Sequence, residues 1–260
     1  MSQTRRAYSA DLEIAAPCRS YIVRILAITG AGVSAESGIP TFRGKDGYWR
    51  NLDATKLATP EAFQRNPKLV WEWYRERRQR IRNARPNAAH KAITKLQRHA
   101  DDFLLITQNV DDLHERAGLA HEAMVQIHGN IFITRCSRCD FSFTERADER
   151  QEIPKCPKCA ALMRPGVVWF GEHLPWNEPR RVENYLDRGA CDLVIVTGTT
   201  ATFGYIVDWA LRASRGSGEL IEVNPAETPL SLFATRQVRA PAAIALPRIV
   251  DAIVDCRSRA

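Results

Sequence analysis

The chain has 260 residues, of which 45% are apolar and 26% are charged. This composition is ordinary for a globular protein with a sizeable core. Lysine and arginine (37) exceed aspartate and glutamate (30) to give a formal charge of +7, which favours anionic ligands. No stretch approaches the ~20 apolar residues that span a bilayer, and no apolar signal-peptide core opens the chain. We therefore expect a soluble, cytoplasmic protein with no membrane partner.

Short apolar runs and longer helical patterns alternate along the chain. A β-branched run over 21–29 predicts a buried strand that leads into the glycine-rich segment 30–38 and a helix start. Residues 39–57, with Pro and Gly, are predicted to form a long loop. Further strands are predicted over 103–107, 124–128, 193–197 and 220–223. Helices are predicted over 60–84, 86–97, 111–117 and 243–254.

This alternation predicts an α/β fold, a Rossmann-like parallel sheet with helices on both faces. Ligands bind such sheets beyond the carboxyl ends of the strands. Glycine or polar clusters follow four of the strands, namely Gly30, Gln108-Asn109, Gly198-Thr199 and Asn224. Their equivalent positions indicate one ligand site at that edge of the sheet.

The segment Gly30-x-Gly32-x-x-Ala35 matches the dinucleotide-binding pattern, with Ala in the third place. The first glycine allows a tight turn, the second allows the backbone to approach a pyrophosphate, and the helix start offers free N–H groups. However, no strand ending in a ribose-binding acid follows about 20 residues later. The dinucleotide is therefore expected to be held differently from that of a hydride-transfer enzyme.

Four cysteines stand in the pattern C-x2-C-x16-C-x2-C, namely Cys136, Cys139, Cys156 and Cys159. Two such knuckles supply four thiolates, enough to close a tetrahedral zinc site with no open position. We expect one structural zinc ion in a small inserted module, in preference to two disulfides. The three other cysteines, Cys18, Cys191 and Cys256, are expected to be reduced thiols.

A run of six arginines carries much of the positive charge: Arg75, Arg77, Arg78, Arg80, Arg82 and Arg85. For most of them we expect a solvated helix face, with nucleic acid or an anionic substrate as the alternatives. His128 follows an apolar strand near the predicted cleft, so we interpret it as a general base, whose pKa suits proton transfer near neutrality. The remaining histidines are expected to be structural or solvated (His90, His99, His114, His121 and His173).

Several motifs occur in the order seen in sirtuins, the NAD-dependent protein-lysine deacylases. They are GAGVSAESGIPTFRG, TQNVDDLHERAG, IHGN, the paired C-x-x-C, VVWFGE and the late strand that ends at Asn224. Residues 20–255 resemble this family. The resemblance implies that the acyl oxygen of an acyl-lysine attacks C1′ of the nicotinamide ribose, that nicotinamide leaves and that an alkylimidate forms. It implies as products free lysine, nicotinamide and 2′-O-acyl-ADP-ribose, and as partners acyl-lysine proteins.

The same resemblance implies roles for individual residues. His128 would be the base and Asn109 would hold nicotinamide and ribose. NAD would contact Gly30, Ala31, Gly32, Glu36, Thr41, Arg43, Gln108, Asn109, Asp111, Gly198, Thr199, Asn224 and Ala242. The strip Val168, Trp169, Phe170 and Gly171 would pair with substrate peptide by β-augmentation. The implied NAD-binding domain covers 20–58, 86–130 and 165–255, and the helical insertion 59–85 with the zinc module 131–164 would form a small domain.

Tyr74 and Arg77 refine the expected substrate, because residues three apart lie on the same face of a helix. The pair resembles the sirtuin branch that removes succinyl or malonyl groups. A short anionic acyl group brings a carboxylate, which a guanidinium and a hydroxyl donor can bind. Ala58 is small at a place where related chains are bulkier. Arg77 could instead belong to the solvated run, and acetyl-lysine stays among the expected substrates.

The chain departs from the family pattern after the strand over 193–197. The family shows G-T-S, small and apolar residues and a proline, whereas this chain has Gly198-Thr-Thr-Ala-Thr-Phe203-Gly-Tyr205. The usual N-x-E becomes Asn224-Pro225-Ala226, which keeps the Asn and loses the acid.

Two other functions stay open at this point. A protein ADP-ribosyltransferase could use the same NAD site, although it has no evident need for Tyr74 and Arg77. A non-enzymatic zinc-ribbon binder of nucleic acid could use the cations near the knuckles (Arg135, Arg138, Lys155 and Lys158). That second function would leave His128 and Asn109 without a purpose, so nucleic acid is not the expected partner.

Overall fold

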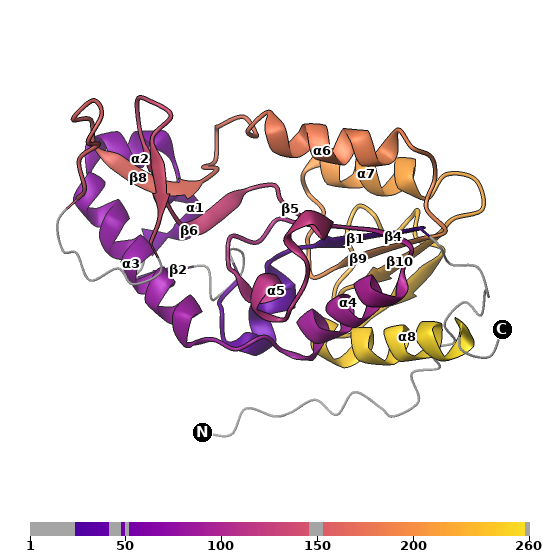
Figure 1. The fold of residues 1–260 in the computed structure, drawn as a ribbon. Coiled ribbons are helices and arrows are strands. Elements are labelled where there is room, and N and C mark those ends of the chain that lie inside the picture. Colours follow the sequence, from indigo (N-terminus) through magenta and orange to yellow (C-terminus); the bar gives the residue numbers. More distant parts are fainter. Residues whose placement is uncertain (1–23, 42–47, 50–51, 146–152, 258–260) are drawn as a thin grey trace, which may run out of the picture.

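The computed structural model describes residues 24–41, 48–49, 52–145 and 153–257 (Figure 1). A parallel six-stranded sheet forms its centre, in the order β11-β10-β9-β1-β4-β5. The strands are β1 (Arg24–Thr29), β4 (Asp102–Thr107), β5 (Met124–Gln126), β9 (Leu193–Thr197), β10 (Glu219–Val223) and β11 (Arg236–Val238). The prediction of an α/β fold built on a parallel sheet is confirmed; only the three-residue β11 was not predicted.

Helices cover both faces of this sheet (Figure 1). On one face lie α4 (Ala88–His99) and α8 (Ala242–Arg257), and on the other lie α6 (Asn177–Leu186) and α7 (Gly204–Ala213). Successive strand residues point to opposite faces. In β1, Ile25 and Ala27 therefore join the core beneath α4 and α8, while Leu26 and Ile28 join the core beneath α6 and α7. We call these six strands and four helices the sheet unit.

The strands of the sheet unit end at one level. Thr29 lies opposite both Thr107 and Thr197, and Thr197 lies opposite Val223. Since all these strands run in the same direction, the segments that follow them emerge side by side. The register therefore brings the four predicted glycine and polar clusters to one edge, as expected.

A second, smaller group of elements packs around its own apolar cluster, which includes Phe63, Trp71 and Trp169. It consists of α1 (Ala54–Leu57), α2 (Pro60–Arg65), α3 (Pro67–Asn83) and the antiparallel sheet β7-β6-β8. The strands of this sheet are β6 (Gly129–Cys136), β7 (Ser142–Thr144) and β8 (Met163–Val167). We call this group the small unit; the predicted domain boundaries stay a prediction.

Two helix predictions need correction. The single helix predicted over 60–84 is broken at Asn66, whose side chain accepts a hydrogen bond from the Leu69 amide and caps α3, with Pro67 at its first position. Proline fits the first turn of a helix but not its interior. The segment after Gly30 is a 3-10 helix, η1 (Ala31–Ser37).

The predicted loop 39–57 contains α1 and a short antiparallel pair, β2 (Tyr48–Trp49) with β3 (Leu52–Asp53). The other short elements are α5 (Leu113–Arg116) and the 3-10 turn η3 (His121–Ala123). No described helix has the length and apolar character needed to cross a membrane. Cys191 is a buried free thiol, but Cys256 is disulfide-bonded, so the expectation of a reduced thiol is wrong there.

Candidate active site

A cavity of about 630 Å³ is lined by both units. The sheet unit contributes the segments at the carboxyl ends of its strands, and the small unit contributes α3 and the end of β8. Every residue expected to bind NAD or substrate within the described chain lines this cavity, and so does His128. Arg43 alone falls outside the described residues. The structure therefore brings together groups that are up to 212 positions apart in the sequence, from Gly30 to Ala242.

The glycine-rich turn is held against the end of β9. The Gly30 amide donates to the Thr197 carbonyl at 3.1 Å, and the Gly32 amide donates to the Gly198 carbonyl at 2.8 Å. A Cβ atom on Gly32 would lie 2.8 Å from the Gly198 Cα. These glycines are thus required where two backbone segments cross. The Gly32 amide is therefore engaged within the chain.

Polar side chains beyond β4 form a connected network at the cavity. Asn109 Nδ2 donates to Ser34 Oγ at 3.1 Å, and Ser34 Oγ donates to Asp111 Oδ2 at 2.9 Å. Burial raises the pKa of the Asp111 carboxyl. Gln108 Nε2 donates to Thr199 Oγ1 at 2.9 Å and so ties β4 to the segment after β9. Ser34, which joins Asn109 to Asp111, was missed by the sequence prediction although it lies inside the glycine-rich motif.

Two buried histidines, His90 and His114, lie next to this network. The His90 Nε2 lies 3.4 Å from Ser34 Oγ, and the His114 Nε2 lies 3.2 Å from Thr29 Oγ1. Their rings are 4.7 Å apart. Burial lowers the pKa of His90 to about 4 and that of His114 well below the ordinary value. Both rings are therefore neutral near pH 7, which fits the structural role expected of them.

His128 follows β5 and lines the cavity. Its Nδ1 lies 3.0 Å from the Gln108 carbonyl oxygen, which can only accept, so Nδ1 carries the proton of the neutral ring. The Nε2 atom then holds the free lone pair, and it lies 2.8 Å from the Tyr205 hydroxyl. Burial lowers the pKa of His128. A neutral imidazole with its lone pair on Nε2 is the form that a general base requires.

Tyr74 and Arg77 reach the cavity from α3. The indole Nε1 of Trp169 donates to the Tyr74 hydroxyl at 2.9 Å, which fixes the phenol and leaves its own O–H to donate. Burial raises the pKa of Tyr74 to about 12, so that hydroxyl stays protonated. The Arg77 guanidinium lies 5.1 Å from the Trp73 ring centre. The Tyr74 hydroxyl and the Arg77 guanidinium thus each lie against a tryptophan side chain at the cavity.

The arginine run on α3 is not uniformly solvated. Arg78 has no exposed surface, and its guanidinium donates to the Ile131 carbonyl at 2.7 Å, the Ile133 carbonyl at 3.2 Å and Thr134 Oγ1 at 2.9 Å. It therefore fastens α3 to β6. The prediction of a solvated face fails at Arg78 because the sequence gives no sign of which helix face packs on β6.

The segment Val168–Gly171, expected to pair with peptide, lines the cavity. Its amides are partly engaged within the chain: Val168 donates to the His128 carbonyl and Phe170 to the Ala58 carbonyl, each at 2.9 Å. The Glu172 carboxylate accepts from the Trp169 amide at 2.8 Å. The chain itself therefore engages three consecutive amides of the strip, which fixes the strip at the wall of the cavity.

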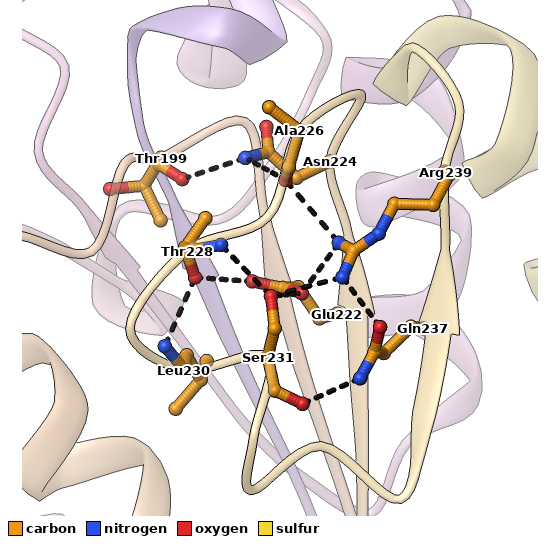
Figure 2. Close-up of polar contacts among 9 residues, drawn as sticks. All are labelled: Thr199, Glu222, Asn224, Ala226, Thr228, Leu230, Ser231, Gln237 and Arg239. Atoms are coloured by element: carbon orange, nitrogen blue, oxygen red, sulfur yellow. Dashed lines mark hydrogen bonds and ion pairs between the residues drawn. The ribbon is translucent and has the colours of Figure 1, made fainter.

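The loop after β10 is organised around a buried carboxylate (Figure 2). Glu222 is only 1% exposed; it accepts from Arg239 at 2.8 Å, from Ser231 at 2.5 Å and from the Thr228 hydroxyl. The Asn224 amide group donates to the Thr199 carbonyl at 3.2 Å (Figure 2). Glu222 thus anchors the loop that carries Asn224 to the cavity. Glu222 was not singled out from the sequence.

The four predicted zinc ligands lie together at one end of the small unit. Their sulfur atoms are all within 4.8 Å of one another, and none is in a disulfide. Tetrahedral Zn–S bonds of ~2.3 Å place sulfurs about 3.8 Å apart; the closest pairs here are 3.4 to 3.7 Å apart. The Arg138 and Cys139 amides donate to Cys136 Sγ. The cluster fits one structural zinc ion.

A parallel sheet with a glycine turn, strand-end polar groups and a basic imidazole at one cavity defines a nucleotide-binding α/β enzyme. The chain belongs to the Sir2 family, whose profile matches residues 30–203, and it is an enzyme of the sirtuin type. An NAD-dependent protein deacylase of Aquifex aeolicus (strain VF5) is 47% identical, covering 88% of this chain and 95% of the relative.

Other relatives and solved structures of the same family also match most of the chain. NAD-dependent protein deacylase 1 of Archaeoglobus fulgidus is 45% identical over 87% of this chain and 91% of its own. A solved Sir2 homologue–NAD complex matches with a TM-score of 0.83 and 43% identity over 90% of each chain. A Sir2–p53 peptide–NAD+ complex matches with a TM-score of 0.74 and 30% identity, over 88% of this chain and 92% of that one.

Proposed function

We propose that this chain is an NAD-dependent protein-lysine deacylase that removes succinyl or malonyl groups as well as acetyl groups. Relatives over most of the chain are named as NAD-dependent protein deacylases, and a similar structure holds NAD. NAD is consumed in this reaction and is therefore a substrate. The acyl-lysine would enter the same cavity from the side of residues 168–171, and the peptide complex of a relative supports a protein substrate.

The sheet unit would hold NAD. Gly198, Thr199 and Asn224 lie on the part of the cavity beyond β9 and β10, where phosphates and the adenosine ribose would bind, with Ala242 beside the adenine. Gln108, Asn109 and Asp111 would hold the nicotinamide ribose, since the Ser34 network fixes the Asn109 amide and the Asp111 carboxylate relative to each other. Gly30 and Gly32 would let the backbone approach the pyrophosphate. Ala31, Glu36, Thr41 and Arg43 would belong to the loop that contacts NAD from the glycine-rich segment.

His128 would act as the base after nicotinamide has left. A ribose hydroxyl gives its proton to Nε2 and attacks the acyl carbon; the lysine amine is then expelled, and water completes 2′-O-acyl-ADP-ribose. The structure supports this role through the Nδ1 hydrogen bond to Gln108, which fixes the tautomer. Near pH 7 the ring is neutral because burial lowers its pKa.

The anionic-acyl preference rests on one observation: Tyr74 and Arg77 line the same cavity, beside the small Ala58. A buried carboxylate needs a cation and hydrogen-bond donors, because an unpaired charge away from water is costly. The guanidinium and the phenol O–H supply both. A solvated helix face would not place the Arg77 guanidinium 5.1 Å from the Trp73 ring centre. Burial lowers the pKa of Arg77, and the neighbouring Tyr74 and Asp111 partly offset that shift.

The test compares nicotinamide release from matched succinyl-lysine and acetyl-lysine peptides. Arg77→Met should lower kcat/KM for the succinyl peptide by about 10- to 150-fold, the range for one charge-assisted hydrogen bond, and change acetyl turnover much less. Arg80→Met, on an exposed position of the same helix, is the matched control and should change neither. Equal losses on both peptides would assign Arg77 to structural support, and no NAD-dependent release from either would reject the deacylase.

The nucleic-acid alternative has less support. Two of the four cations near the knuckles are paired with carboxylates, Arg135 with Glu172 at 3.5 Å and Lys158 with Asp140 at 3.2 Å. Paired cations contribute less to a positive field than isolated ones.

A further inference from the structure

The segment after β9 carries two aromatic residues, Phe203 and Tyr205, where the sirtuin pattern has smaller residues and a proline. Tyr205 lies in the first turn of α7, and its hydroxyl is 2.8 Å from the Nε2 atom of His128. Both aromatic residues line the same cavity as His128. The departure from the family pattern therefore acts directly on the proposed base.

The Nε2 atom of a neutral imidazole has one in-plane lone pair and accepts one good hydrogen bond. Because Nδ1 donates to the Gln108 carbonyl, the ring cannot turn to offer its other nitrogen without losing that bond. Tyr205 must then be the donor in the contact with Nε2. A sugar hydroxyl that is to give its proton to Nε2 needs the same lone pair, so the phenol and the sugar cannot occupy it together.

The phenol is held in place by its neighbours. The rings of Tyr205 and Phe203 are stacked, 5.4 Å apart and 9° from parallel, and the Trp209 ring lies 5.1 Å from the Tyr205 ring at a 48° tilt. Phe203 also meets the edge of His128 at 5.6 Å. Burial raises the pKa of Tyr205 to about 12, so its hydroxyl remains a donor at neutral pH.

We propose that the Tyr205 hydroxyl is a displaceable cap on His128: it occupies the lone pair of Nε2 in the free protein and must leave before the ribose hydroxyl can be deprotonated there. Tyr205 is thus a positioning residue that acts through His128. The inference rests on the proposed deacylase function. No atom of Tyr205 is consumed; the proton moves from the sugar hydroxyl to Nε2, and the phenol keeps its own.

The first experiment uses Tyr205→Phe, which removes the hydroxyl and keeps the aromatic stack. Exchange of labelled nicotinamide into NAD reports formation of the intermediate, which does not need the base, and release of free lysine reports the step that does. The ratio of lysine release to exchange should rise about fivefold, the equivalent of one neutral hydrogen bond. Tyr185→Phe is the matched control: its hydroxyl donates to the Ile25 carbonyl inside the sheet unit, so its ratio should stay unchanged.

Two results would overturn the cap. A ratio that falls tenfold or more would make Tyr205 a proton relay, and an unchanged ratio would mean that its hydroxyl does not compete with the sugar. A second measurement does not depend on turnover: the ¹⁵N signal of His128 Nε2 should move in Tyr205→Phe and not in Tyr185→Phe. If that signal stays in place, the cap is rejected, whereas absent exchange in the unaltered protein would reject the deacylase itself.

Discussion

The sheet unit and the small unit line one cavity, but they are stabilised by different interactions. The sheet unit buries two large apolar clusters, one on each face. The small unit has one apolar cluster, but it also buries the guanidinium of Arg78 among backbone carbonyls. At its far end only Cys136, Cys156 and Met163 are fully buried in the local cluster. Apolar burial of ~25 cal/mol per Å² therefore supports both units, whereas the small unit depends in addition on a polar clamp and, at its far end, on four sulfurs.

This contrast separates two tasks of the site. The groups proposed to bind NAD stand at the ends of strands that the apolar clusters hold rigidly. Tyr74 and Arg77, which are proposed to select the acyl group, stand on α3, whose position depends on Arg78 and on β6. Weakening the small unit should therefore alter acyl selection before it affects NAD binding.

Removing one sulfur should have the largest effect. Cys136→Ser leaves three thiolates, and since structural zinc sites contribute most of the folding free energy of small modules, β6, β7 and β8 should lose protection in hydrogen exchange while the six-stranded sheet keeps it. Zinc content should fall from one ion per chain towards none. Cys191→Ser, at a buried free thiol of the sheet unit, is the control. Full zinc content and unchanged exchange in Cys136→Ser would contradict a structural metal.

Arg78→Met tests the polar clamp. The substitution keeps much of the side-chain volume but leaves the Ile131 and Ile133 carbonyls and the Thr134 hydroxyl without this donor, at a cost of about 3 kcal/mol in the free energy of unfolding. Acyl-peptide turnover should fall more than NAD affinity, because α3 carries Tyr74 and Arg77. Arg80→Met on the exposed face should change stability by less than about 0.5 kcal/mol. Equal stabilities for both variants would show that Arg78 is not a clamp.

Much of the sheet unit could be predicted from the sequence because its signals are local. Buried parallel strands are short apolar runs. The residue after each strand lies at the carboxyl edge of the sheet, whichever helix or loop leads to the next strand. This is why Gly30, Gln108, Gly198 and Asn224 were expected together and were found together. Cysteine spacing likewise predicted the sulfur cluster, since each knuckle is a local turn.

The remaining features depend on contacts between distant segments. Neither α6 nor α7 was predicted from the sequence, although the buried residues Val182, Tyr185 and Leu186 of α6 have the i, i+3, i+4 spacing of a helix. Arg78 is distinguished from the neighbouring arginines by its hydrogen bonds to β6. Tyr205 acts on the site because His128, which follows β5, lies beside its hydroxyl. Glu222 has no distinguishing feature in the sequence, and its role depends on the ion pair with Arg239, 17 positions away (Figure 2). No local pattern identifies such pairs.

The smallest effect concerns pH and the sheet unit alone. His90 has a pKa of about 4 in the fold because it is buried, whereas a histidine in the unfolded chain titrates near 6.5. Between these values the unfolded state binds a proton that the folded state does not, so the free energy of unfolding falls as pH decreases, by up to about 1.4 kcal/mol per pH unit for this group. The loss begins as pH drops below about 6.5 and ends near pH 4. Urea unfolding of the unaltered protein and of His90→Gln at several pH values between 7.5 and 4.5 isolates this contribution. At pH 7.5 the variant should be the less stable, because His90 is bonded to Asn87 and lies near Ser34. The difference in the free energy of unfolding between the two proteins should decrease towards pH 4.5. If the free energies of unfolding of the two proteins instead change equally with pH, His90 is solvated in the fold. A buried, neutral imidazole would then not be what holds Ser34 and Asn109 in place.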